Sequence, residues 1–237
     1  MPGWRAVNSL RGLHCKAVTV IEIPLFPLRT VLFPGAELPL RIFEERYRAM
    51  TRELLAGGGV FGVLLIREGK EAGGGAIPHS IGTTAEIEES REIDGGRFVL
   101  STRGVQRFRL IRMLAPRPYP YGQVELIDDA RYERELRLER AIETVRTTFP
   151  LYFRLALSLT DQWARGLALP HNPHDLVNFL APWLQVEEEV KQRLLEIETA
   201  AERVAHLAEV IDDLLTRTRA DVAEHRRNKF DGYGSRN

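Results

Sequence analysis

The spacing of apolar residues along the chain changes near residue 130. Before this point, short apolar runs alternate with glycine, proline and polar residues, a pattern typical of β-strands. After it, apolar residues recur every three or four positions, which predicts amphipathic helices. The predicted strands are Val18–Phe26, Val60–Ile66, Gly82–Glu89, Phe98–Ser101, Gln106–Met113 and Gly122–Ile127. The pattern therefore indicates an α+β protein.

The helical pattern also sets the expected domain organisation. One helix, from about Glu44 to Ala56, interrupts the strand region and ends at three consecutive glycines. Four helices are expected in the second half, with a break at Pro150: Tyr132–Phe149, Leu151–Trp163, Pro173–Leu184 and Glu187–Arg219. We expect a flexible lead-in over residues 1–17, a β-domain over 18–130, a helical bundle over 131–225 and a tail over 226–237.

The segment from Ile23 to Tyr47 is rich in proline. Pro24, Pro27, Pro34 and Pro39 each lack a backbone donor, so the segment cannot form a central strand throughout. Short edge strands joined by tight bends are expected instead. The run from Phe33 to Ala36 fits a type II turn, with proline at the second position and Gly35 at the third, where φ is positive.

The same segment resembles the opening of the amino-terminal, substrate-recognition domain of Lon-type ATP-dependent proteases. Further segments resemble elements of that family in the same order: residues 81–87 (IGTTAEI), 92–98 followed by 104–110 (EIDGGRF and GVQRFRL), and 190–196 with Arg203 and Val204 behind them. The resemblance extends over residues 20 to 215, about four fifths of the chain.

The resemblance implies both a fold and a function. The implied fold is a PUA-like, six-stranded pseudobarrel with one inserted helix, followed by a helical bundle with a long last helix. The implied function is a freestanding, non-catalytic module that binds unfolded or apolar polypeptide segments. Candidate peptide-binding residues are Leu28, Val31, Leu32, Phe33 and Leu38, with Arg29 at the rim. The alternative for each apolar residue is packing on the first helix.

The sequence predicts no catalytic residue and no cofactor. A complete Lon protease continues into an ATPase module and a protease module with a serine–lysine dyad. The single Gly-Lys pair, at residues 69–70, has Leu64 where a phosphate-binding loop needs its first glycine and Glu71 where it needs a hydroxyl. Ser101 or Ser158 near Lys191 would be the available serine–lysine pair, and neither lies in a recognisable catalytic pattern.

A metal site is considered at His171, His174 and Asp175, because histidines three residues apart share one side of a helix. Capping explains the same residues without a metal. Asn172 is the expected N-cap and Pro173 the expected first helical residue. The negative charge of Asp175 in the first turn complements the helix dipole. We therefore predict a helix start here and no metal.

Charge and composition narrow the list of partners. Lys plus Arg and Asp plus Glu both number 33, so the basic surplus typical of nucleic-acid binding is absent. The PUA-like shape that the resemblance implies is also used by RNA-binding modules, so an RNA-binding function remains an alternative. Arg103, Arg107, Arg109 and Arg112 could form a basic stripe, although alternate residues of one strand facing solvent would give the same pattern. The composition, which includes a single cysteine, Cys15, and no long apolar run, favours a cytoplasmic protein without a membrane partner.

A third interpretation is an adaptor that docks on an ATP-dependent protease or another enzyme and presents substrates to it. The contact surface would then be the long last helix, with exposed acids such as Glu198 and Glu209 as its contact residues.

Overall fold

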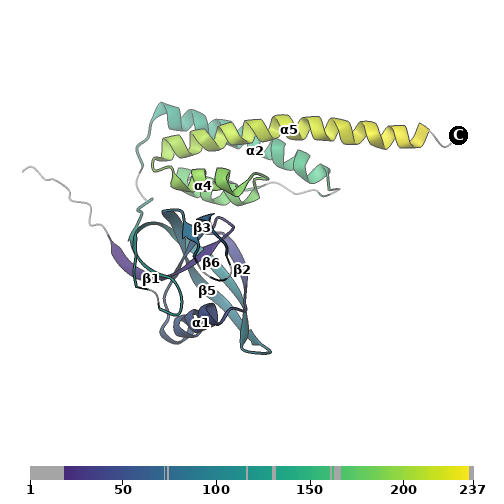
Figure 1. The fold of residues 1–237 in the computed structure, drawn as a ribbon. Helices are drawn as coiled ribbons and strands as arrows, with labels where there is room; N and C mark the ends of the chain where they lie inside the picture. The colour runs from purple at the N-terminus through teal and green to yellow at the C-terminus, as the bar shows by residue number, and fades with distance from the viewer. Residues whose placement is uncertain are drawn as a thin grey trace, which may run out of the picture.

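A computed structural model describes residues 19–71, 73, 75–115, 117–129, 132–160, 162 and 167–234. The strands are β1 (Val20–Leu28), β2 (Glu37–Ile42), β3 (Phe61–Glu68), β4 (Ile77–Pro78), β5 (Ile81–Ile93), β6 (Arg97–Met113) and β7 (Tyr121–Leu126). The helices are α1 (Glu45–Gly57), α2 (Leu136–Ser158), α3 (Pro173–Leu180), α4 (Glu188–Glu196) and α5 (Ala200–Gly234), with a 3-10 helix, η1 (Ala181–Trp183), after α3. The strands form one layer, and α2 to α5 form a second layer against one end of it (Figure 1).

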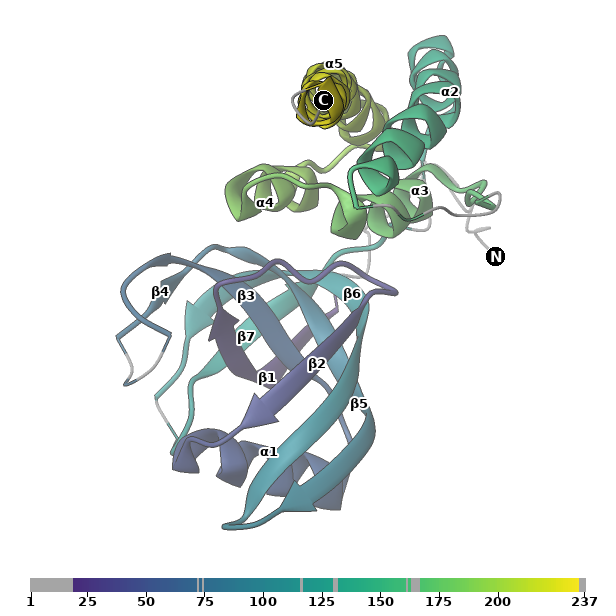
Figure 2. The same ribbon diagram turned by 90° about the vertical axis from the view of Figure 1, so that its right-hand side faces the viewer.

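The sheet closes into a barrel because β1 pairs with two strands along different parts of its length. Residues 20–24 pair antiparallel with β7, and residues 25–28 pair parallel with β3. The remaining pairs, β7 with β6, β6 with β5 and β5 with β3, complete the ring. β2 lies outside the ring and pairs with the first half of β6 (Figure 2).

The prolines of β1 fit this change of partner. Pro24 lies where pairing with β7 ends, and Pro27 lies in the half that pairs with β3. Each half has a partner on one side only, so a missing N–H is tolerated as on an edge strand. The predicted division of residues 23–42 into short strands and bends is confirmed.

The turn between β1 and β2 has the predicted geometry. The amide of Ala36 donates to the carbonyl of Phe33 at 3.1 Å, and Gly35 has a φ of 80°. β6 passes so close to this turn that a Cβ on Gly104 would lie 2.2 Å from the Phe33 carbonyl oxygen. Glycine at position 104 is therefore required for the approach.

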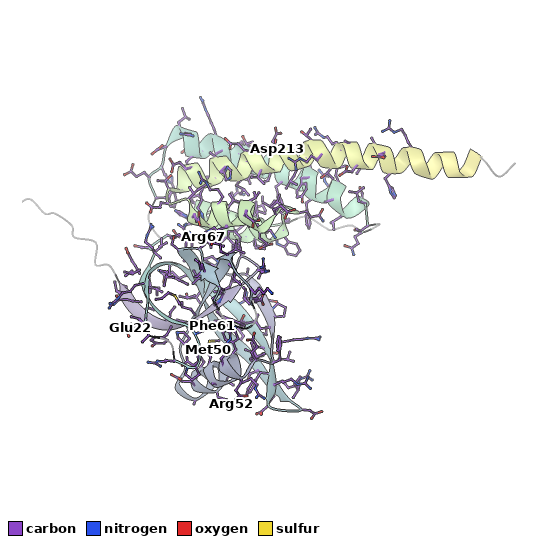
Figure 3. All side chains as sticks on the ribbon, viewed as in Figure 1. Glu22, Met50, Arg52, Phe61, Arg67 and Asp213 are labelled. Atoms are coloured by element: carbon purple, nitrogen blue, oxygen red, sulfur yellow. The ribbon has the colours of Figure 1, made fainter. Side chains whose placement is uncertain are left out.

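α1 closes the end of the barrel away from the other helices (Figure 2). Tyr47, Met50 and Leu54 form its buried face and belong to the same core as Phe61 of β3. Figure 3 shows Met50 and Phe61 inside the barrel layer. The predicted boundaries of this helix differ from the observed ones by one residue at each end.

The helical layer differs from the expectation at two places. Pro150 lies inside the continuous helix α2 instead of ending a helix. The predicted helix from Glu187 is two helices, α4 and α5, separated at residues 197–199, and α5 continues to Gly234, well past Arg219. The predicted Pro173 helix is confirmed as α3 followed by η1.

The α+β fold class is confirmed, and the strand count differs from the prediction. Seven strands are present where six were expected, because β2 and the two-residue β4 were not counted. The predicted strands at residues 98–101 and 106–113 are one long strand, β6. Within the part of the chain that the structure describes, no helix is both long enough and apolar enough to span a membrane.

Candidate functional site

A groove of about 800 Å³ lies where the barrel meets the helical layer. One wall of the groove consists of the turn before β2, the first residue of β2 and two residues of β6. The other wall consists of residues from the loop before α3, from α3 and from η1. The lining residues are Pro34, Gly35, Ala36, Glu37, Arg103, Val105, Pro170, Asp175, Asn178, Phe179, Pro182 and Trp183. The lining is mostly apolar, as is usual for ligand-binding clefts.

Two aromatic side chains are the most unusual feature of the groove. Phe179 and Trp183 are 37% and 57% exposed, although aromatic residues of this size usually lie in a core. The Trp183 ring makes an edge-to-face contact with the ring of Phe153, with 5.9 Å between the ring centroids. Phe153 in turn stacks on the buried Phe149 of α2. The groove therefore presents a supported aromatic surface to solvent.

Arg103 is the one arginine among the lining residues of the groove, and its side chain is already hydrogen-bonded. Its side chain donates to the Gly35 carbonyl at 2.8 Å, to Glu37 at 3.0 Å and to Glu88 at 2.5 Å. These contacts raise the pKa of Arg103, mainly through the hydrogen bond to Glu88. By contrast, no described residue forms an ion pair with Asp175 on the opposite wall. The charges around the groove therefore favour a cationic partner over an anionic one.

Two buried arginines join the barrel to the helical layer beside this groove. Arg107 of β6 donates to the carbonyls of Leu195 and Ile197 at 2.5 and 2.8 Å, and Arg203 of α5 donates to the carbonyl of Leu194 at 2.8 Å. These are carbonyls at the carboxyl end of α4, which lack partners within the helix and carry partial negative charge. The arginines therefore cap α4.

A carboxylate and a histidine complete the buried cluster. Asp129 accepts from two nitrogens of Arg107, at 2.8 and 2.5 Å, and its Oδ1 lies 3.6 Å from Nδ1 of His174. Burial alone would raise the pKa of Asp129, but the hydrogen bonds and charge of Arg107 outweigh this and lower it. Burial is also the main cause that lowers the pKa of His174 to about 4 and that of Arg203 to about 9.

None of the six predicted peptide-binding residues lines the groove, and Leu28 lines a separate hollow beside β2. Leu28, Leu32 and Phe33 are buried in the core, with exposed fractions of at most 5%. Leu38 is half-buried against the cluster that includes α1, as the packing alternative expected, whereas Val31 is half-buried against the cluster of the helical layer. Arg29 is exposed, and its side chain donates to the Gly69 carbonyl at 2.7 Å. The groove uses the residues between Phe33 and Leu38 instead, and a peptide-binding role for the six stays a prediction.

The predicted basic stripe on β6 is largely neutralised. Arg107 is fully buried instead of facing solvent, because it caps α4 and pairs with Asp129. Arg103 pairs with two glutamates, and Arg109 pairs with Glu198 at the end of α4. Arg112 donates to Gln123 at 3.0 Å. Arg107 therefore does not contribute to a basic surface, and a basic stripe formed by the other three arginines stays a prediction.

The capping interpretation of Asn172 is confirmed. Its side-chain oxygen accepts from the amides of His174 and Asp175 at 2.8 and 3.2 Å, and Pro173 occupies the first turn of α3. The His174 ring faces Asp129 and Arg203 instead of His171. Within the described part of the chain, no group of three or more metal-ligating residues is assembled. Cys15 and Lys16 fall outside the described residues.

Sequence patterns missed two sets of residues at the candidate site, although signals for both exist. Arg203 occupies the apolar face of α5, at four-residue spacing with Leu207 and Ile211, which indicates a buried cation. Phe179 and Trp183 are also four residues apart and share the face of Asp175, away from the buried residues of α3. No comparable local signal marks Arg107, because the α4 carbonyls that bury it are distant in sequence.

This chain is an α+β protein in which a closed barrel lies under a helical layer, with a groove where the two meet. The chain belongs to the family of the ATP-dependent protease La (LON) substrate-binding domain, whose family model matches residues 22–213. It is 25% identical over 198 residues to the Lon protease of Syntrophus aciditrophicus and 27% identical over 190 residues to that of Porphyromonas gingivalis. The alignments cover 81% and 77% of this chain and 25% and 22% of those relatives, so the chain spans about a quarter of their length.

Solved structures agree with this assignment. The Lon N-terminal domain protein from Xanthomonas campestris is 28% identical, with a TM-score of 0.58, and the match covers 79% of this chain and 96% of that one. The N-terminal domain of the Mycobacterium avium complex Lon protease has the same TM-score at 20% identity, over 83% and 98% of the two chains, and supports the fold alone.

Proposed function

We propose that this chain is a non-catalytic module that binds unfolded or apolar polypeptide segments in the groove between the barrel and the helices. The exposed pair Phe179 and Trp183, of which Trp183 is supported by Phe153, is the observation that carries the proposal. Aromatic side chains of this kind dominate the energetics of protein–protein contacts. Membership of the Lon substrate-binding domain family supports the same conclusion.

The experiment measures fluorescence anisotropy of labelled oxidised insulin B chain, an unfolded apolar polypeptide, with the purified chain. The double variant Phe179→Ser, Trp183→Ser is expected to weaken binding by at least about tenfold, because both aromatic anchors are lost. The matched control is Leu136→Ser, which changes a side chain that is 63% exposed on α2, away from the groove. Equal affinities for the two variants, with intact folds by circular dichroism, would remove the support for this site.

Salt dependence separates this function from RNA binding. Binding through apolar contacts is expected to change little between low and moderate salt, whereas binding to phosphates falls steeply. Labelled single-stranded RNA is the comparison probe. Arg103, Arg107 and Arg109 are each paired with a carboxylate, so we expect the chain to bind RNA more weakly than it binds the polypeptide.

The adaptor interpretation also has a structural observation in its favour. α5 is 35 residues long and extends far beyond α2 in Figure 1, so exposed positions along it are available for contact with another protein. Glu198 is a poor test of docking, because it pairs with Arg109 across the junction. Glu209, exposed on α5, is the better position; Glu209→Arg should abolish docking on a protease partner in a pull-down if α5 is the contact.

A further inference from the structure

β2 has one free edge, and this edge connects the groove to a second hollow. β2 pairs with β6 alone, over its whole length. Its first residue, Glu37, lines the groove described above. The later part of β2 lines a hollow of about 140 Å³, whose lining residues are Phe26, Leu28, Pro39, Leu40, Arg41, Ile42, Phe43, Glu44, Tyr47 and Glu71. The strand therefore has a mostly apolar groove at its first residue and a hollow of mixed polarity along residues 39–42.

The register determines which backbone groups of β2 point to its free edge. The amide of Gly104 donates to the carbonyl of Ala36 at 2.9 Å, so even-numbered residues of β2 direct their backbone groups toward β6. The carbonyls of Glu37, Pro39 and Arg41 and the amides of Glu37 and Arg41 therefore point away. None of these groups bonds to another described element. An added strand could pair with all of them.

Exposed aromatic side chains mark both ends of this edge. Phe43, directly after β2, is 65% exposed beside the second hollow, and Trp183 is 57% exposed in the groove. Six residue steps separate Glu37 from Phe43, which is about 20 Å in an extended strand. An extended polypeptide could therefore place one bulky apolar side chain at each end.

Charge adds a third property of the ligand. The Asp175 carboxylate faces the groove without an ion-pair partner among the described residues, while Arg103 is satisfied by Glu37 and Glu88. A basic side chain beside the first apolar anchor would pair with Asp175, whereas an acidic one would be repelled.

We propose that the ligand is an extended polypeptide segment that adds as a strand to the free edge of β2. One bulky apolar side chain enters the groove at Trp183, a second lies against Phe43 about six residues away, and a basic residue next to the first pairs with Asp175. This inference rests on the proposed function and specifies the class of polypeptide that the site takes.

Backbone methylation tests the strand pairing directly. The probe is a labelled synthetic peptide of about nine residues, with lysine and phenylalanine at one end, leucine six positions later, and threonine and valine between them. N-methylation of the alternate residues whose amides face β2 is expected to weaken binding by about tenfold or more, because each loses a hydrogen bond. Methylation of the other set of alternate residues is expected to change affinity little, whatever the direction of the added strand.

Side-chain variants test the two ends. Phe43→Ser is expected to weaken the two-anchor peptide several-fold and to leave unchanged a peptide with serine in place of the leucine. Leu55→Ser is the matched control, since Leu55 is 44% exposed on α1 and lines neither the groove nor the hollow. Asp175→Asn is expected to remove the preference for lysine over glutamate beside the first anchor.

The outcomes separate this inference from the proposed function. Binding that depends on Trp183 but ignores both the methylation pattern and Phe43 would overturn strand addition, while polypeptide binding in the groove would stand. A complete lack of Trp183-dependent binding, for insulin B chain and synthetic peptides alike, would overturn both. Methylation sensitivity of one alternate set, together with the Phe43 effect, would establish the extended ligand.

Discussion

Arg107 shows how a single buried cation can join two layers of a protein. Its side chain has no exposed surface, and an unpaired guanidinium there would be strongly unfavourable. Four hydrogen bonds offset the loss of water: two to Asp129 and one each to the carbonyls of Leu195 and Ile197. The residue therefore stabilises the junction only as long as every partner is present.

Replacing Arg107 is expected to be far more destabilising than replacing its neighbour on the same strand. Arg107→Met leaves the Asp129 carboxylate and two α4 carbonyls without donors, and should lower the free energy of unfolding by about 3–5 kcal/mol. Arg109→Met removes only an exposed ion pair with Glu198 and should cost about 1 kcal/mol or less. Urea denaturation of both variants checks this, and comparable losses would show that Arg107 is not an essential cap.

His174 is expected to make the free energy of unfolding decrease as the pH falls through the mildly acidic range. Burial lowers its pKa in the folded state to about 4, from an ordinary value of 6.5, and its side chain is only 3% exposed. Between these two pH values the unfolded chain binds more protons than the folded one, so stability falls as pH decreases. The loss should reach about 2–3 kcal/mol near pH 4 and grow further as Asp129, whose pKa is lowered, becomes protonated.

Histidine variants assign this pH dependence. His174→Gln keeps an acceptor for Arg203 but cannot take up a proton, so the slope of stability between pH 6.5 and about 4 should become shallower. His171→Gln, at an exposed histidine, should leave the slope unchanged. Urea denaturation at several pH values measures the slopes, and equal slopes for both variants would assign the pH dependence to other groups.

Helix starts show how far local sequence determines elements. The start of α3 was predictable because Asn172 and Pro173 act on backbone groups within one turn. The start of α5 carries a similar signal that the apolar periodicity concealed. Thr199 Oγ1 accepts from the Glu202 amide at 3.3 Å, as in a Thr-x-x-Glu capping box, and the Glu202 carboxylate accepts from the Thr199 hydroxyl at 2.8 Å.

The cap of α3 is expected to contribute measurably to stability. Asn172→Ala removes the acceptor for two amides and should cost about 1 kcal/mol, whereas Asn172→Asp retains the acceptor and should cost little. Thermal unfolding compares the two. A similar loss for both variants would indicate that the amide group of Asn172, rather than its capping oxygen, is what the structure needs.

The candidate site was less predictable than the elements, for a physical reason. Strand and helix periodicity depend on neighbours in sequence, but the groove exists because residues 34–37 meet Phe179 and Trp183 across the junction. Sequence reasoning selected the segment that contains this turn and chose its apolar residues, three of which are buried in the core and two half-buried. Exposure depends on the packing of distant elements, and a single sequence does not reveal that packing.

One buried apolar cluster crosses the junction between the barrel and the helical layer, and two further clusters lie within the barrel and under α1. Phe33 and Ile81 from the barrel belong to the same buried cluster as α2, α3, α4 and α5. Polar contacts follow the same junction: Glu188 accepts from the Val31 amide at 2.7 Å, and Gln192 donates to the Ile81 carbonyl at 3.0 Å. The domain boundary near residue 130 stays a prediction, and one buried cluster extends across it.

This shared cluster predicts that the two layers unfold together and that Arg107 maintains their coupling. Hydrogen exchange measured by mass spectrometry in increasing urea should give the same unfolding midpoint for β5 and for α3 and α5. Arg107→Met should separate the midpoints, because the apolar contacts of Phe33 and Ile81 must then hold the junction beside an unpaired Asp129. Arg109→Met is the control and should leave the midpoints together, since its ion pair is exposed.

Separate midpoints in the unaltered chain would mean that the layers are independent folding units, whereas coincident midpoints in the Arg107 variant would assign the coupling to apolar packing alone.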